Sequence, residues 1–162
     1  SVSTITRLID MGMEPFLISS TLSGVLAQKL IRKVCEECKE TYDVSISDLE
    51  SLDIPKPILE KFNGTLTRGV GCGNCHDTGY QGRVGIYEFL VLNDEIQNAI
   101  LHTPDANSIQ KVALKNGLKL LTHDCAEKMI EGITTLEEFM RVSQEVSTEP
   151  TEPTEPLQEN IE

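Results

Sequence analysis

Two cysteine pairs limit what this chain can fold into more than any other feature of its sequence. They lie at residues 35–38 and 72–75, each in the pattern Cys-X-X-Cys, with 33 residues between them. Two facing turns of this kind supply four thiolates at tetrahedral corners, the closed geometry of a structural zinc site. Gly71 and Gly73 permit the second turn to aim backbone N–H groups at the sulfurs. We predict a zinc site that folds the intervening loop and catalyses nothing, with the ligands Cys35, Cys38, Cys72 and Cys75.

Other roles for the cysteines remain open from the residues alone. Redox dithiols of the thioredoxin kind use one such pair at a helix start rather than two matched pairs. Disulfides suit an exported chain, whereas five cysteines without a signal peptide favour a reduced compartment. His76 could replace a ligand, although four cysteines already suffice. Cys125 shares a helical stripe with Leu121 and Met129, which predicts core packing rather than nucleophilic catalysis.

Composition excludes several classes of protein. The chain has 162 residues, with 26 acidic and 14 basic side chains and a formal net charge of −12. A dedicated nucleic-acid binder needs clustered Lys and Arg, so this balance argues against a nucleic-acid partner. No apolar run approaches the roughly 18 residues that a membrane span requires, so we expect no membrane insertion.

Half of the net charge of −12 lies at one end of the chain. Residues 145–162 hold six Glu and no basic residue, and Thr-Glu-Pro occurs three times within residues 148–156. Proline at every third position blocks a helix, and the glutamates repel one another. We therefore predict a disordered acidic tail over residues 146–162, with no assigned role.

Hydrophobic periodicity predicts a mixed α/β body. Residues 83–92 are β-branched and aromatic with two apolar faces, which indicates a strand covered on both sides. Residues 24–34 fit either a helical stripe or a buried strand. The region between the cysteine pairs is rich in loops, with one or two short helices over residues 47–61. A helix is expected over residues 3–11, capped by Ser3 or Thr4, and another from Pro15 to Ile18. Four more are expected from Asp94 to His102, from Asn107 to before Gly117, over 122–131, and from Thr134 onward, where Thr134 with Glu137 makes the clearest capping box.

No nucleotide-binding motif is present in the sequence. The pattern G-x-x-x-x-G-K-[ST] does not occur in the chain. Residues 89–95 look like an apolar strand ending in acids, as at a magnesium site. Asn93 and Asp94 are better explained as helix caps, and Glu95 suits the positive end of a helix. We predict no catalytic residue and no nucleotide-binding residue in this chain.

Three blocks of sequence resemble one known family. They are TRLIDMGMEPFLISSTLSGVLAQKLIRKVC at 6–35, GCGNCHDTGYQGRVGIYEFL at 71–90 and GITTLEEFMRV at 132–142. In this order they are similar to the GspE/PilB-type assembly ATPases of type II secretion and type IV pili. The resemblance covers about residues 1–144. It carries over the four cysteines as functional residues; Lys29 stands where the family often has Arg, so no nucleotide contact is assigned there.

The resemblance implies a fold and a division of the chain. Members of this family are hexameric ATPases that lie in the cytoplasm, peripheral to the inner membrane. The implied fold is an α/β fragment with the last strands and helices of a RecA-like domain, an inserted tetracysteine zinc subdomain and a C-terminal helical bundle. The divisions are 1–34 for the end of the RecA-like core, 35–82 for the zinc-binding subdomain, 83–93 for the returning strand, 94–145 for the helical bundle and 146–162 for the tail.

Two hypotheses for function follow. In the first, the chain is the C-terminal part of a secretion or pilus ATPase, whose ATP and Mg²⁺ bind only in the full-length parent. Its partners would be inner-membrane platform proteins and neighbouring ATPase subunits. In the second, the chain is a stand-alone zinc-binding protein-interaction module. The second explains the cysteines equally well, but it does not explain the two apolar strands that flank them.

Overall fold

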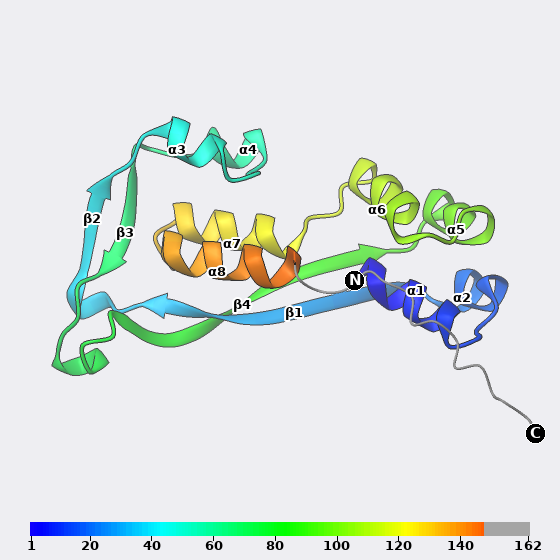
Figure 1. Ribbon diagram of the computed structural model, residues 1–162, viewed down its shortest axis with the longest axis horizontal. Helices are drawn as coiled ribbons and strands as arrows, with labels where there is room; N and C mark the ends of the chain where they lie inside the picture. Colours follow the sequence, from blue (N-terminus) through cyan, green and yellow to red (C-terminus); the bar gives the residue numbers. More distant parts are fainter. Residues whose placement is uncertain (148–162) are drawn as a thin grey trace, which may run out of the picture.

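A long antiparallel hairpin forms the axis of the molecule. The computed structural model describes residues 1–147, so residues 148–162 of the predicted tail lie outside the described part. Strand β1 (Gly24–Val34) pairs with β4 (Tyr80–Val91), from Gly24 opposite Val91 to Arg32 opposite Arg83, with an irregularity before Val34 (Figure 1). Residues 24–34 are therefore a strand, and the predicted strand at 83–92 is confirmed with an earlier start.

A second hairpin leaves the end of the first. Strands β2 (Lys39–Asp43) and β3 (Thr65–Gly69) pair antiparallel, and Figure 1 shows them running across the direction of β1 and β4. The connection between them holds the short helices α3 (Ile46–Glu50) and α4 (Lys56–Leu59), which confirms the helices expected over residues 47–61. The β2–β3 pairing is not predicted from the sequence.

Six further helices lie along the first hairpin rather than forming one bundle with each other. Figure 1 shows α5 and α6 beside α1 and α2 at one end, and α7 and α8 over the middle. Strands of 11 and 12 residues extend roughly 36–40 Å, about twice the length of the longest of these helices, which has 12 residues and extends about 18 Å. The four helices predicted over 94–145 are present, but they lie in two pairs with separate hydrophobic cores, so the predicted helical bundle is not confirmed. The helices are α1 (Val2–Asp10), α2 (Pro15–Thr21), α5 (Asp94–His102), α6 (Ala106–Lys115), α7 (Leu121–Ile130) and α8 (Leu136–Ser147).

Each helix group has its own hydrophobic core. Ile31 and Ile86 of the hairpin pack with α3, α4, α7 and α8, whereas Leu90 packs with α1, α2, α5 and α6. No helix among residues 1–147 has the length and apolar character needed to cross a lipid bilayer.

Several predicted helix caps are wrong by one or more residues. Helix α1 begins at Val2, after Ser1, rather than after Ser3 or Thr4. Thr134 is not a cap because its hydroxyl donates to the Arg32 carbonyl at 2.8 Å, a contact between distant segments. The observed caps are Asn93, Asp105 and Thr135, whose side chains accept from the amides of Ile96 (3.0 Å), Ser108 (2.9 Å) and Glu138 (3.2 Å).

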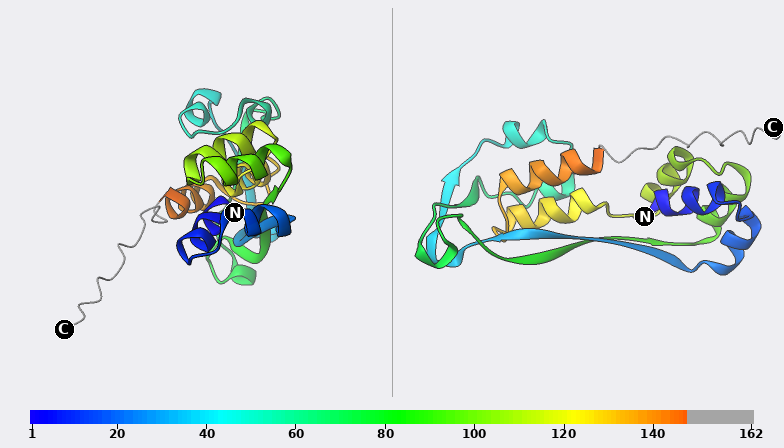
Figure 2. Two further views of the ribbon diagram at one scale, coloured as in Figure 1. Left: turned by 90° about the vertical axis from the view of Figure 1, so that its right-hand side faces the viewer. Right: turned by 60° about the horizontal axis from the view of Figure 1, so that its bottom comes forward.

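Only one face of the first hairpin is covered within the described residues. In the right-hand view of Figure 2, the helices lie on one side of β1 and β4, apart from α2, which lies at the end of the hairpin. The opposite face carries large apolar side chains that are 46–60% exposed. The prediction that both faces are covered is therefore wrong for residues 1–147. The exposed side chains are Leu26, Leu30, Tyr87, Phe89 and Val91.

A buried carboxylate ties α8 to β1. The Glu138 side chain is fully buried and accepts from the Arg32 backbone amide (2.9 Å), Arg32 Nε (2.7 Å) and Arg141 Nη2 (2.6 Å). The Arg32 guanidinium also lies 4.0 Å from the centre of the Tyr80 ring. Burial alone would raise the pKa of Glu138, but these donors, Arg141 first, outweigh burial and lower the pKa to about 2.

We expect Glu138→Gln to lower the free energy of unfolding by about 1–3 kcal/mol at pH 7, because hydrogen bonds to an ionised acceptor weaken. The pKa of Glu138 in the folded protein is below the ordinary glutamate value of 4.5, so the stabilisation is present above pH 4.5 and is lost as the pH falls toward 2. Urea unfolding at pH 7 and pH 3 measures this, and the difference from wild type should shrink at pH 3.

Glu137→Gln is the matched control. Its side chain is 75% exposed and contacts Arg32 Nη2 at 3.3 Å, so its loss should cost about 0–1 kcal/mol. Equal free energies of unfolding for Glu138→Gln and wild type at pH 7 would contradict the stabilising role assigned to the ionised Glu138 carboxylate.

Candidate metal centre

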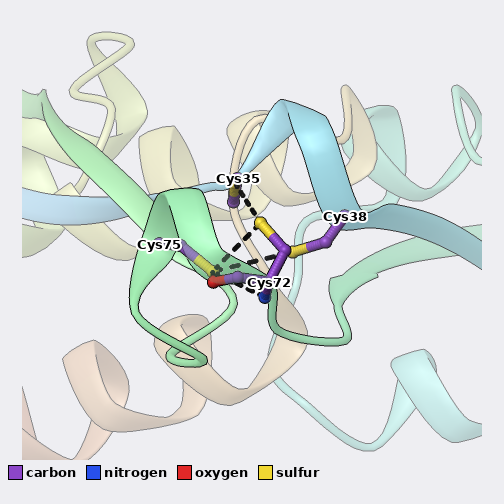
Figure 3. Close-up of side chains that lie close together, drawn as sticks. All are labelled: Cys35, Cys38, Cys72 and Cys75. Carbon is purple, nitrogen blue, oxygen red and sulfur yellow. Dashed lines mark hydrogen bonds between the residues drawn. The ribbon is translucent and has the colours of Figure 1, made fainter.

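The four predicted ligand cysteines meet at the corner between the two hairpins. Cys35 follows β1, and Cys38 ends the short 3-10 turn Glu36–Cys38 that leads into β2. Cys72 precedes a second such turn, Gly73–Cys75, on the path from β3 to β4. Figure 3 shows the side chains of both turns converging. The structure thus brings together all four residues that the sequence selects.

The sulfur positions fit one tetrahedral metal ion. The Sγ–Sγ distances are 3.9 Å for Cys35–Cys72, 3.8 Å for Cys38–Cys75 and 3.7 Å for Cys72–Cys75. All four Sγ atoms lie within 4.8 Å of one another. A tetrahedron with metal–sulfur bonds of about 2.3 Å has edges of about 3.8 Å. A disulfide requires about 2.05 Å, and all four cysteines are free thiols in this structure.

Backbone amides point at two of the sulfurs. Gly71 N–H donates to Cys38 Sγ at 3.3 Å, while Cys72 N–H and Gly79 N–H each donate to Cys75 Sγ at 3.2 Å. Burial would raise the pKa of Cys75, but these two amides and the neighbouring thiols lower it to about 6. These amides thus favour the thiolate of Cys75, the form that binds a metal, whereas burial raises the pKa of the neighbouring Cys38 thiol to about 12.

Gly71 and Gly73 are predicted to let the second turn aim backbone N–H groups at the sulfurs, and the structure confirms this for Gly71. Gly71 has φ +95°, a left-handed conformation that favours glycine, and it donates to a sulfur as expected. Gly73 lies outside this conformation, and among the described residues its amide donates to no cysteine sulfur.

A close approach of Gly69 and Gly79 holds the corner together and was not predicted. A Cβ on Gly69 would lie 2.0 Å from the Gly79 carbonyl oxygen, so no larger residue fits there. Beside this crossing, Cys35 N–H donates to the Gly79 carbonyl at 2.9 Å and Val70 N–H donates to the Cys38 carbonyl at 3.1 Å. The sequence feature that could have indicated this close approach is a glycine on each side of the second cysteine pair.

The other candidates lie apart from the four sulfurs. His76 is exposed in a left-handed conformation (φ 52°) and is not among the clustered residues. Cys125 is fully buried in the core, where burial raises the pKa of its thiol to about 12. Glu95 accepts from Asn116 Nδ2 at 2.9 Å, and Asn93 caps α5, so the acids after β4 serve the helix start.

The fold and the site together define an α/β protein with a four-sulfur corner inserted into a long hairpin. The family model described as "Type II/IV secretion system protein" matches residues 1–141, so the chain belongs to that family. The resemblance read from the sequence is thereby confirmed.

Individual relatives agree with this family. The chain is 42% identical over 140 residues to the type IV pilus assembly ATPase PilB of Thermus thermophilus. The aligned residues make up 86% of this chain and 16% of the relative. It is 40% identical over 145 residues to type II secretion system protein E of Pseudomonas aeruginosa, covering 90% of this chain and 28% of the relative. The type II secretion system ATPase E of Vibrio cholerae is 40% identical over 147 residues, with 90% and 28% covered. The chain thus spans less than a third of the length of these relatives.

We expect Cys38→Ser to lower the bound metal from about one ion per chain to near zero, because a hydroxyl replaces a thiolate in a closed four-ligand site. The metal content is measured by elemental mass spectrometry. The protein is purified under reducing conditions and without chelators. The same variant should also lower Tm, since metal binding contributes to folding.

Cys125→Ala provides the control. It removes a buried thiol and so destabilises the core, but it leaves the four sulfurs in place and should keep the metal content of wild type. A wild-type chain with far less than one ion would overturn the metal assignment.

Proposed function

We propose that this chain is the C-terminal region of a cytoplasmic hexameric ATPase that powers type II secretion or type IV pilus assembly. The observation that carries the proposal is the family match over residues 1–141, together with relatives named as secretion and pilus assembly ATPases. Because the chain spans 16–28% of the three relatives' lengths, the nucleotide site is assigned to the longer parent. ATP and Mg²⁺ bind there, and no residue of this chain is given a catalytic role.

The role proposed for the four cysteines is to hold a structural zinc ion. Four thiolates with tetrahedral spacing leave no open ligand position, so the ion supplies folding energy rather than chemistry. In the parent, residues 1–34 and 83–93 would be the last strands and helices of a RecA-like domain, 35–82 the inserted zinc subdomain and 94–145 the C-terminal helices.

The outer surface of the corner is proposed as an interaction site. Val70 is 54% exposed two residues before Cys72, and Asn74, His76 and Asp77 in and after the Cys72–Cys75 turn are also exposed. An apolar side chain with a polar rim is typical of a protein contact. The proposed partner is an inner-membrane platform protein or a neighbouring ATPase subunit, which would hold the protein at the membrane without inserting it.

ATP hydrolysis tests the proposal directly. We expect no phosphate release above the protein-free blank from this chain, and clear hydrolysis from the longer polypeptide that contains it, because the P-loop contacts are needed for catalysis. Phosphate release at saturating MgATP is the measurement.

A variant of the longer polypeptide that lacks its P-loop lysine controls for contaminating ATPases. Hydrolysis by this chain alone, persisting after further purification, would contradict the proposal. A longer polypeptide without ATPase activity would contradict it as well.

A further inference from the structure

One buried cysteine of the four-sulfur cluster receives no hydrogen bond from the backbone. The amides that point at sulfurs serve Cys38 and Cys75. Cys72 is partly exposed, so solvent can hydrate its sulfur. Cys35 is fully buried, and among the described residues the polar contacts of its Sγ atom are with side chains alone. A buried thiolate without a donor is costly, because the charge loses its hydration and gains no hydrogen bond in return.

The side-chain amide of Gln81 lies beside the Cys35 sulfur. The thiol donates a weak hydrogen bond to Gln81 Oε1 at 3.9 Å. Val34 lies opposite Tyr80, and the Cys35 amide donates to the Gly79 carbonyl. Because side chains alternate along each strand, Cys35 and Gln81 lie on one face, diagonally across this end of the hairpin. A long side chain can span such a diagonal.

Asn74 connects the Gln81 amide to the second cysteine turn. The Asn74 Nδ2 atom donates to Gln81 Oε1 at 3.1 Å, and Asn74 belongs to the 3-10 turn Gly73–Cys75. Gln81 therefore contacts a sulfur of the first cysteine pair and a residue inside the second. Both Asn74 and Gln81 are exposed, so hydrophobic packing does not explain why their side chains meet beside the cluster.

The observed contact between Cys35 and Gln81 requires a free thiol. A thiol has one hydrogen to donate to an amide oxygen, whereas a thiolate can only accept. With a metal-bound sulfur, the unchanged contact would place two acceptors, Sγ and Oε1, face to face. A glutamine amide carries an acceptor on one side and two N–H donors on the other, so turning it over presents a donor to the sulfur.

We propose that Gln81 is a positioning residue of the zinc site, which holds Cys35 in place as a ligand by donating Nε2–H to its sulfur. The inference rests on the structural zinc ion of the proposed function. In the loaded protein, the amides of Gln81 and Asn74 are turned over together. One N–H of Gln81 then bonds Cys35 Sγ, and the other bonds Asn74 Oδ1. The proton of the Cys35 thiol passes to solvent when the zinc–sulfur bond forms.

Nuclear magnetic resonance detects this hydrogen bond directly. Zinc is replaced by a magnetic isotope of cadmium, which also binds thiolates, and couplings from the metal through sulfur to N–H protons are recorded. The backbone amides of Gly71 and Gly79 should show such couplings, because they donate to sulfurs. We expect a further coupling to the Nε2 protons of Gln81. A spectrum with the backbone couplings but without the coupling from Gln81 would overturn the inference.

Substitution of Gln81 gives a second readout. Gln81→Leu removes the donor at similar size and should lower the zinc affinity about 10–100-fold, the usual effect of losing the partner of a metal ligand. Gln81→Lys, whose side chain can only donate, should restore most of this affinity. The matched control is Gln28→Leu, the same exchange at an exposed position of β1 away from the cysteines, which should keep the wild-type affinity. Competition with a chromophoric chelator measures all four proteins.

The outcomes separate the role of Gln81 from the zinc site itself. A wild-type chain that binds far less than one zinc ion refutes the site, and with it the role of Gln81. One ion per chain, with equal affinity in wild type and Gln81→Leu, refutes the role of Gln81 and keeps the site. Equal losses in Gln81→Leu and Gln81→Lys would also refute it, since a donor would then be without effect. If Gln81→Leu fails to fold, the couplings in the wild-type protein decide.

Discussion

The pairing of β1 with β4 is the interaction on which the rest of the molecule depends. The strands are far apart in sequence, and an isolated two-stranded hairpin is marginal in water. The helices stabilise it by burying one face, through Ile31, Ile86 and Leu90. The register of this pairing in turn positions the four-cysteine corner. Because Val34 lies opposite Tyr80, the next residue, Cys35, lies close enough for its amide to donate to the Gly79 carbonyl. The two cysteine pairs meet because the strands before and after them are already aligned.

The β2–β3 hairpin depends on both of its ends. At the corner, the four sulfurs and the Gly69–Gly79 crossing fix where the chain leaves and returns. At the far end, Leu49 and Leu66 belong to the same core as Met129 and Phe139 of α7 and α8. Glu138 connects these ends, since it holds α8 against Arg32 of β1, just before the corner. The β2–β3 hairpin is thus held by the four-cysteine cluster at one end and by hydrophobic packing at the other.

Local chemistry was predictable from the sequence, and tertiary geometry was not. The spacing of Cys35, Cys38, Cys72 and Cys75 selects the cluster because each turn is local. Residues 24–34 could not be assigned from periodicity, since only pairing with a distant strand decides between helix and strand. The prediction of Thr134 as a helix cap is wrong because its hydroxyl donates to a carbonyl 102 residues away. The Gly69–Gly79 contact was missed for the same reason, as it joins two segments that no local pattern links.

The sequence pattern of the first hairpin and its structure disagree most in the number of faces that are buried. Residues 83–92 are apolar on both faces, as a strand covered on both sides requires. Full burial of a large apolar side chain contributes about 1.5–3 kcal/mol, and each of the five side chains on the bare face is 46–60% exposed, so each forgoes roughly half of that amount. A sequence specifying a one-sided hairpin would alternate polar and apolar residues there. The apolar pattern therefore matches a strand with two covered faces, whereas the helices among residues 1–147 cover only one of them.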